Sequence, residues 1–267
     1  MIMRRNNSEK IFILLIGHGS RLPHNKEMVD MHADLLRKKG YNVCTAFNEM
    51  TDPPIEEAMR SMIRNGAEEI VALPLFIAPG RHTEQDIPPK LGIPEGYGCW
   101  ISTKYGREVK VHYKEPFGDD LSIPKILVGK LKEIGCSDNT GVLIISHGSP
   151  MEHNSNLVHR TSERLRKSGV KNVFIGFNEY NEPRIEDAYA EMMEAGFDRI
   201  IVLPMFLASG THIAEEIPEK LGIPGKSRVW IVRKGCKAVT VFYTGPLGLN
   251  PKMNDILVKK IESSVAS

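Results

Sequence analysis

The sequence has no apolar run long enough to cross a membrane. Its longest candidates, Ile11–Ile16 and Ile200–Leu203, have the length of a β-strand, whereas a membrane-spanning helix needs about 18–20 apolar residues. The basic residues near the N-terminus are followed by too short an apolar stretch for a signal peptide. We therefore expect a cytoplasmic protein that does not bind membranes.

The sequence also lacks a strong excess of either charge. Its 35 lysines and arginines are balanced by 33 aspartates and glutamates, for a formal net charge of +2. Nucleic-acid binding usually needs a strong basic excess, so we expect no nucleic-acid partner. Cysteine is scarce and has no metal-motif spacing, which favours reduced thiols in the cytoplasm. The four cysteines are Cys44, Cys99, Cys136 and Cys236.

Several motifs of common cofactor and nucleophile sites are missing. Neither a Walker A sequence nor a Gly-x-Gly-x-x-Gly sequence follows the first apolar segment, so nucleotide binding by those routes has no support. Ser20 follows Gly-His-Gly and does not lie in the Gly-x-Ser-x-Gly turn of α/β-hydrolases. The sequence therefore disfavours a nucleotide-dependent enzyme and a serine hydrolase.

What the sequence does contain is an internal duplication. His147 follows His18 by 129 residues, and His212 follows His82 by 130 residues. This period is far longer than the ~20–50 residues of solenoid repeats, which indicates a duplicated domain. We expect domains at 1–138 and 139–267, related by a pseudo-two-fold axis. The matching segments are 13–20 with 143–149, 46–49 with 176–179, 71–76 with 201–206, and 80–88 with 210–218.

Within each copy, strand patterns alternate with helix patterns. Continuous apolar runs indicate strands buried on both faces, while apolar residues at helical spacing that end at glycine indicate helices. This alternation predicts an α/β fold in which each copy has a four-stranded, mostly parallel sheet flanked by helices. The first copy is expected to have strands at 11–16, 41–47, 69–76 and 109–113, and helices at 24–39, 54–65, 84–91 and 122–134.

Two histidines and one glutamate in each copy follow the ends of predicted strands. Because ligands of open α/β sheets bind at the carboxyl ends of the strands, we expect each set to converge there. Two imidazoles and a carboxylate suit cobalt, nickel, zinc or ferrous iron. A single histidine or glutamate here would more often be structural, but the same order and spacing occur twice. The two sets are His18, Glu49 and His82, and His147, Glu179 and His212.

These motifs resemble the class II tetrapyrrole chelatases, which include sirohydrochlorin cobaltochelatases, nickelochelatases and ferrochelatases. The resemblance rests on Gly-His-Gly-Ser-Arg, Phe-Asn-Glu, Leu-Pro-Leu-Phe and Gly-x-His-(x)3-Asp-Ile-Pro, and it covers both halves. It implies that His18 and His82 ligate metal and accept protons, with Glu49 as an added ligand or base. Small archaeal members resemble one copy and act as homodimers, so the fused chain is expected to be a monomer.

The resemblance implies an enzyme that inserts Co²⁺ into sirohydrochlorin with release of two protons, as in cobalamin biosynthesis. Nickel insertion for a methanogenic cofactor and iron insertion for sirohaem need the same residues and stay open. A metal or tetrapyrrole carrier on the same fold is a non-enzymatic alternative. The metal (Co²⁺ or Ni²⁺) is a substrate, and no organic cofactor is expected.

Substrate binding should involve residues beside the histidines of the first copy. Sirohydrochlorin is a polycarboxylate, so cations near the site would hold it. Arg21 and Arg81 are the expected cations, and Ser20 and Gly80 are the other expected contacts. The second copy has Pro150 and Thr211 at the positions of the two arginines, so we expect the first copy to hold the productive site.

Overall fold

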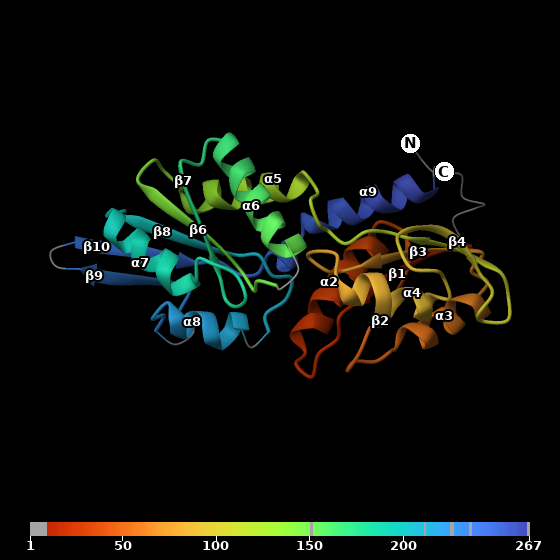
Figure 1. The fold of residues 1–267 in the computed structure, drawn as a ribbon. Coiled ribbons are helices and arrows are strands. Elements are labelled where there is room, and N and C mark those ends of the chain that lie inside the picture. Colours follow the sequence, from red (N-terminus) through yellow and green to blue (C-terminus); the bar gives the residue numbers. More distant parts are fainter. Residues whose placement is uncertain (1–9, 150–151, 211, 225–226, 235–236, 266–267) are drawn as a thin grey trace. The chain divides into compact units, whose positions relative to one another are not determined.

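The computed structural model describes residues 10–149, 152–210, 212–224, 227–234 and 237–265. Their contacts divide the chain into two compact units, one made of residues 1–118 and 251–267 and the other of residues 119–250. Figure 1 shows that each unit contains one sheet with helices on its faces. Each unit contains most of one sequence repeat together with a helix that the sequence assigns to the other repeat.

The sheet of the first unit has the strand order β2-β1-β3-β5-β4. The first four of these strands are parallel, whereas β4 pairs with β5 in the antiparallel direction at the edge. Leu14, Ile16 and Ala72 on the central strands are completely buried, as continuous apolar strands in a two-sided sheet must be. The strands are β1 (Ile11–Gly17), β2 (Asn42–Phe47), β3 (Glu69–Pro74), β4 (Gly98–Ser102) and β5 (Val109–Tyr113).

Two pairs of helices cover the sheet of the first unit. Helix α2 (His24–Lys38) contacts β1, β2 and α9 (Met253–Val265) on one face. Helix α3 (Ile55–Arg64) packs with α4 (Ile87–Leu91) on the other. Buried residues such as Ile55, Met59 and Met62 recur on α3 at helical spacing, which gives this helix a single apolar face to pack on the sheet.

The second unit repeats this plan with the strand order β7-β6-β8-β10-β9. Its strands are β6 (Thr140–Ser146), β7 (Asn172–Phe177), β8 (Arg199–Pro204), β9 (Val229–Lys234) and β10 (Lys237–Tyr243). Helix α5 contacts α6, and α7 packs on β6, β7 and α8. The helices are α5 (Ser122–Ile134), α6 (Glu152–Lys167), α7 (Ile185–Ala195) and α8 (Ile217–Lys220), with a short 3-10 turn, η3 (Leu247–Leu249).

The predicted α/β class is confirmed, with one difference in each sheet. The structure has five strands per sheet because β4 and β9 add an antiparallel edge strand. The segment Gly98–Ser102 is short and mostly exposed, so it lacks the apolar run that identifies the central strands. In the described part of the chain, no helix has both the length and the apolar character that a membrane span requires.

The compact units differ from the two sequence repeats in the placement of two helices. Helix α5 lies in the repeat that ends at 138 but belongs to the second unit, and α9 lies in the later repeat but belongs to the first unit. The contacts of α5 with α6, and of α9 with α2 and β3, account for this exchange. Sequence periodicity identifies such helices but does not say on which sheet their apolar faces pack.

The register of the parallel strands sets up the functional edge. Gly17 pairs with Phe47 on β2, and Ile16 pairs with Pro74 on β3. The three strands therefore end at nearly the same level, and the loops that follow them share one edge of the sheet. This is the carboxyl edge, where open α/β sheets bind their ligands.

Candidate metal-binding site

The loops after β1 and β2 are held in direct contact. Backbone N–H groups of Asn48 and Glu49 donate to the carbonyls of Gly17 and His18, at 2.9 and 3.1 Å. Gly19 has a φ of +90°, and a Cβ atom placed there would lie 1.6 Å from the Glu49 carbonyl oxygen. Only glycine permits both the backbone conformation and this approach. The second glycine of Gly-His-Gly thus brings His18 beside Glu49.

The sequence predicted His82 in the loop before a helix. In the structure it lies in the first turn of that helix. The segment η1 (His82–Asp86) is a π-helical turn in which the Ile87 N–H donates to the His82 carbonyl. It precedes α4, so the expected helix begins at residue 82 instead of 84. Single π-turns inside helices occur often at functional sites because they redirect a side chain.

Thr83 fixes the position of this turn. Its hydroxyl donates to the Gly80 carbonyl at 3.0 Å and accepts from the phenol of Tyr97 at 2.9 Å. Burial raises the pKa of Tyr97 to about 12, so its phenol stays protonated and donates. A second phenol, that of Tyr113, donates to the Thr83 carbonyl at 2.7 Å. These bonds hold the turn that begins at His82 from Tyr113 at the end of β5 and from Tyr97, which directly precedes β4.

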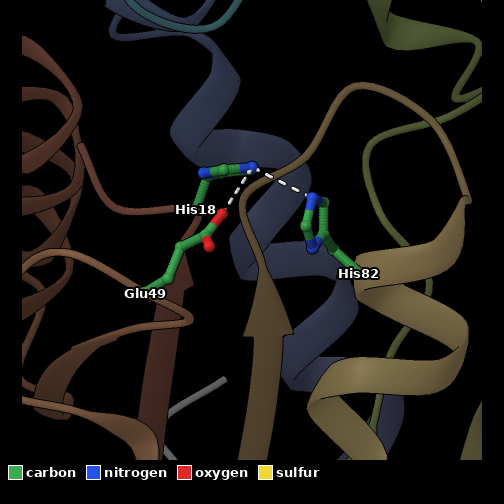
Figure 2. Close-up of side chains that lie close together, drawn as sticks. All are labelled: His18, Glu49 and His82. Carbon is green, nitrogen blue, oxygen red and sulfur yellow. Dashed lines mark hydrogen bonds and ion pairs between the residues drawn. The ribbon is translucent and has the colours of Figure 1, made fainter.

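The three predicted residues of the first copy converge. Nε2 of His18 lies 3.1 Å from Nε2 of His82 and 3.3 Å from Oε1 of Glu49. One donor atom from each residue lies within 4.8 Å of the other two. Figure 2 shows the three side chains pointing toward one another from separate segments.

The hydrogen bonds of both imidazoles direct a lone pair into this cluster. Nδ1 of His18 lies 3.0 Å from the Gly19 carbonyl, and Nδ1 of His82 lies 2.8 Å from Oδ2 of Asp86. Carbonyl and carboxylate oxygens only accept, so a neutral ring that donates to them has its proton on Nδ1 and a lone pair on Nε2. Two nitrogen lone pairs and a carboxylate oxygen then face one another. A cluster with this arrangement can share a cation, either a proton or a metal ion.

The spacing of these atoms fits a metal ion. Bonds of ~2.1 Å to adjacent positions of a tetrahedral or octahedral ion put two ligand atoms roughly 3.0–3.4 Å apart. The separations of 3.1 and 3.3 Å lie in that range. The side chains of His18, Glu49 and His82 are 41%, 38% and 38% exposed, so the site is open to a second reactant.

In the second copy the backbone is arranged in the same way. The Glu179 N–H donates to the His147 carbonyl at 2.8 Å, and a Cβ at Gly148 would lie 1.9 Å from the Glu179 carbonyl oxygen. The ring of His147 lies 6.1 Å from that of Tyr180. His212 begins the π-turn η2 (His212–Glu216), but its side chain lies outside the described residues, so the predicted second triad stays a prediction.

The structure places the predicted substrate contacts around the first site. Arg21 is exposed on the loop after β1, and Arg81 is 78% exposed, with its Nε 3.8 Å from Asp86. The Ser20 hydroxyl accepts from the Leu22 N–H at 3.1 Å, which gives it a role in the turn. A Cβ at Gly80 would meet nothing within 4 Å. Pro150 and Thr211, at the positions of the two arginines, lie outside the described residues.

Three polar residues beside the site were missed at the sequence level. Asp86 contacts His82 as described, the Asn48 amide lies 3.2 Å from Nδ1 of His82, and Nζ of Lys90 donates to Oδ1 of Asn48 at 2.9 Å. The signal was the repeat itself, since Asn178 and Lys220 form the same pair at 2.9 Å. A cavity of about 440 Å³ adjoins the site and is lined by Asn48, Glu49, Glu56, Gln85, Asp86, Pro89, Lys90 and Lys104.

Comparison with known proteins identifies the family. The sequence pattern of the CbiX family matches residues 12–134 and again residues 141–264. The chain belongs to the CbiX family. The double match means that the chain carries two family units, which agrees with the internal duplication.

The relatives of this chain include proteins of two sizes. A sirohydrochlorin cobaltochelatase of Methanosarcina acetivorans is 38% identical over 128 residues, which are 98% of that protein and 47% of this CbiX chain. A probable sirohydrochlorin cobaltochelatase of Halobacterium salinarum is 25% identical over 269 residues and covers 93% of the chain and 89% of the relative. The first relative therefore has the size of one copy, and the second has the size of both.

A solved structure shares the whole fold. SirB from Bacillus subtilis, determined with Fe³⁺, superposes with a TM-score of 0.74 at 21% identity and covers 95% of this chain and 94% of SirB. This match shows that the architecture of two α/β units is common to both proteins.

Proposed function

We propose that this CbiX-family chain is a sirohydrochlorin chelatase and that Co²⁺ is the metal it inserts. The observation that carries the proposal is the cluster of His18 Nε2, His82 Nε2 and Glu49 Oε1 at 3.1 and 3.3 Å. The names of the relatives from M. acetivorans and H. salinarum support the substrate and the metal. A cytoplasmic, monomeric protein without an organic cofactor belongs to the same proposal.

In this mechanism the protein residues bind the metal and remove protons from the ring. His18 and His82 take Co²⁺ on their Nε2 atoms and replace part of its water shell, and Glu49 completes one side of the ion. Two pyrrole N–H groups of the macrocycle lose their protons as the ring nitrogens bind the metal. Each imidazole that gives up the metal has a bare Nε2, which accepts one of these protons. The products are the metallated ring and two protons.

The exposed face of the site is suited to a flat ring with acidic side chains. Arg21 and Arg81 lie at this edge beside His18 and His82, where each could pair with a carboxylate of the macrocycle. A charge-assisted pair contributes about 1.5–3 kcal/mol when shielded and ~0–1 kcal/mol when exposed. The second copy has no arginine at either position, which supports a productive site in the first copy.

Turnover with different metals tests this proposal. Purified protein is incubated with excess sirohydrochlorin and Co²⁺, Ni²⁺ or Fe²⁺, and metallation is followed by visible absorption. We expect many equivalents of product per protein and the highest rate above the metal-only background with Co²⁺. Product that stops near one equivalent would mark a carrier instead of an enzyme. A highest rate with Ni²⁺ or Fe²⁺ would retain the chelatase and reassign its metal.

A further inference from the structure

The imidazole of His82 has two competing neighbours at Nδ1. Oδ2 of Asp86 lies 2.8 Å away, and Nδ2 of Asn48 lies 3.2 Å away. A carboxylate can only accept a hydrogen bond, whereas the NH₂ of an amide can only donate one. The two neighbours therefore require opposite states of the ring, since Asp86 needs a proton on Nδ1 and Asn48 needs a lone pair there.

The orientation of the Asn48 amide is fixed by Lys90. Nζ of Lys90 donates both to Oδ1 of Asn48, at 2.9 Å, and to the Asn48 backbone carbonyl. Because an ammonium group only donates, Oδ1 must face Lys90 and the NH₂ group must face His82. Asn48 is also buried, with 7% of its surface exposed, so its side chain has little freedom to turn. The competition at Nδ1 is therefore built into the fold.

We propose that Asp86 is a positioning residue that holds His82 in the tautomer with its proton on Nδ1, against the opposing effect of Asn48. The shorter, charge-assisted bond to Asp86 prevails over the longer, neutral contact. In that tautomer the bare Nε2 faces His18 and Glu49. In the other tautomer Nε2 carries the proton, which points into the cluster and blocks the metal.

The second copy contains the same parts. Lys220 donates to Oδ1 of Asn178 at 2.9 Å, and Nδ2 of Asn178 lies 3.4 Å from Oε2 of Glu216. Glu216 occupies the position of Asp86, one helical turn after the histidine. The amide, the cation that fixes it and a carboxylate therefore occur twice, with glutamate in place of aspartate. This makes Asp86→Glu the natural conservative variant.

This proposal can be tested by two measurements made in the absence of the tetrapyrrole. Its metal-binding part rests on the proposed function. The first is titration with Co²⁺ alone, followed by visible absorption; the second is ¹H–¹⁵N NMR of the imidazole nitrogens of the metal-free protein. For Asp86→Ala we expect Co²⁺ binding weaker by about 10–100-fold, the usual effect of removing such a partner. We also expect the NMR signals of His82 to change from the Nδ1–H to the Nε2–H pattern.

Two rescue variants and one control separate orientation from charge. Asp86→Glu should bind Co²⁺ with an affinity within about threefold of that of the unchanged chain, a small change beside the ~10–100-fold loss expected for Asp86→Ala. Adding Asn48→Asp to Asp86→Ala puts a carboxylate on the other side of Nδ1 and should restore the Nδ1–H pattern. Glu56→Gln removes a negative charge from the lining of the same cavity, and it should leave the tautomer unchanged.

The outcomes distinguish this inference from the proposed function. An Asp86→Ala protein that keeps the Nδ1–H pattern and its Co²⁺ affinity overturns the positioning role, whatever the turnover. An unchanged chain that fails to metallate sirohydrochlorin overturns the function, even if the tautomer of His82 responds as expected. If Asp86→Ala does not fold, Asp86→Leu keeps more of the side-chain volume and is judged by the same two measurements.

Discussion

Thr83 and Ile213 occupy the same position in the two copies, but they hold the π-turn in different ways. In the first copy the threonine hydroxyl bonds to Gly80 and Tyr97, and Tyr113 binds the Thr83 carbonyl. In the second copy only the last bond has a counterpart, from Tyr243 to the Ile213 carbonyl at 3.0 Å. The backbone of the site is thus common to both copies, while the polar side chains that fix it are concentrated in the first.

The two copies therefore share a backbone arrangement but differ in the side chains around it. The glycine that lets the two loops meet occurs in both copies, as Gly19 and Gly148. Close approach of backbone is a requirement of the fold, so it applies to either unit. The threonine and its tyrosine partner hold the π-turn, and neither they nor the two arginines proposed to bind substrate have a counterpart of the same type in the second copy.

The largest expected effect comes from comparing the two histidines of the π-turns. His82→Ala should lower kcat/KM for metallation by on the order of 100-fold or more, because it removes a metal ligand and a proton acceptor together. His212→Ala, at the matching position, should lower it much less. Both variants are assayed with sirohydrochlorin and Co²⁺ by visible absorption. Equal losses, or a larger loss from His212→Ala, would refute the asymmetry between the copies.

A smaller effect on turnover and stability is expected from substituting the glycines at which the two loops of each copy meet. In Gly19→Ala the new Cβ would lie 1.6 Å from the Glu49 carbonyl oxygen, so the loop must shift at a cost of about 1–3 kcal/mol. Gly148→Ala should destabilise its unit by a similar amount. We expect only Gly19→Ala to lower turnover at temperatures where the protein stays folded. Unfolding in urea and turnover are measured on both variants.

Gly40→Ala provides the control for these glycine variants. Gly40 has a φ of +91°, but a Cβ there would meet nothing within 4 Å. The backbone strain alone costs about 1–2 kcal/mol. Gly40→Ala should therefore be less destabilising than Gly19→Ala and should leave turnover unchanged. If all three variants lost the same stability and activity, the close approach of the loops would not be what selects glycine.

At neutral pH, the smallest expected effect on folding stability comes from the buried tyrosines. Burial raises the pKa of Tyr97 and Tyr105 to about 12 in the first unit and that of Tyr189 to about 12 in the second. Burial also raises the pKa of Tyr41 and Tyr113 in the first unit and that of Tyr243 in the second. Since these pKa values exceed the unfolded value near 10.0, the tyrosines support folding fully below pH 10 and lose that effect as pH rises toward about 12.

The first unit, with four such tyrosines against two, should therefore unfold at lower alkaline pH than the second. The chain has two tryptophans, and Trp100 lies in the first unit and Trp230 in the second. Fluorescence of Trp230→Phe and Trp100→Phe proteins then follows one unit at a time. Loss of the Trp230 signal before the Trp100 signal would contradict the expected order.

Much of the fold could be predicted because its signals are local. The buried run at Ile11–Ile16 and the spacing of apolar residues on α3 depend on neighbours in the sequence, and both elements occur where expected. The edge strand β4 was missed since its residues are largely exposed and carry no alternating or continuous apolar pattern. The start of the helix at His82 was missed because π-turn hydrogen bonds leave no pattern of their own in the sequence.

The residues of the candidate site also differ in whether the sequence could identify them. His18, Glu49 and His82 could be selected because they follow strand ends and recur in the second copy, and their convergence is confirmed. Asp86, Asn48 and Lys90 were not selected, although all three have a counterpart in the second copy. Their importance depends on which atom each presents to Nδ1 of His82, and that is a matter of distance and orientation across segments that are far apart in the sequence.

The sequence by itself determined the duplication, the alternation of strands and helices, and the residue types at the carboxyl edge. These follow from periodicity and composition, which are properties of a chain read in order. Only the tertiary structure decided that α5 and α9 pack in the opposite units, and that Nε2 of His18 lies 3.1 Å from Nε2 of His82. Those features arise from side chains that meet across different elements, and their hydrogen-bond partners are set by the packing of the whole unit.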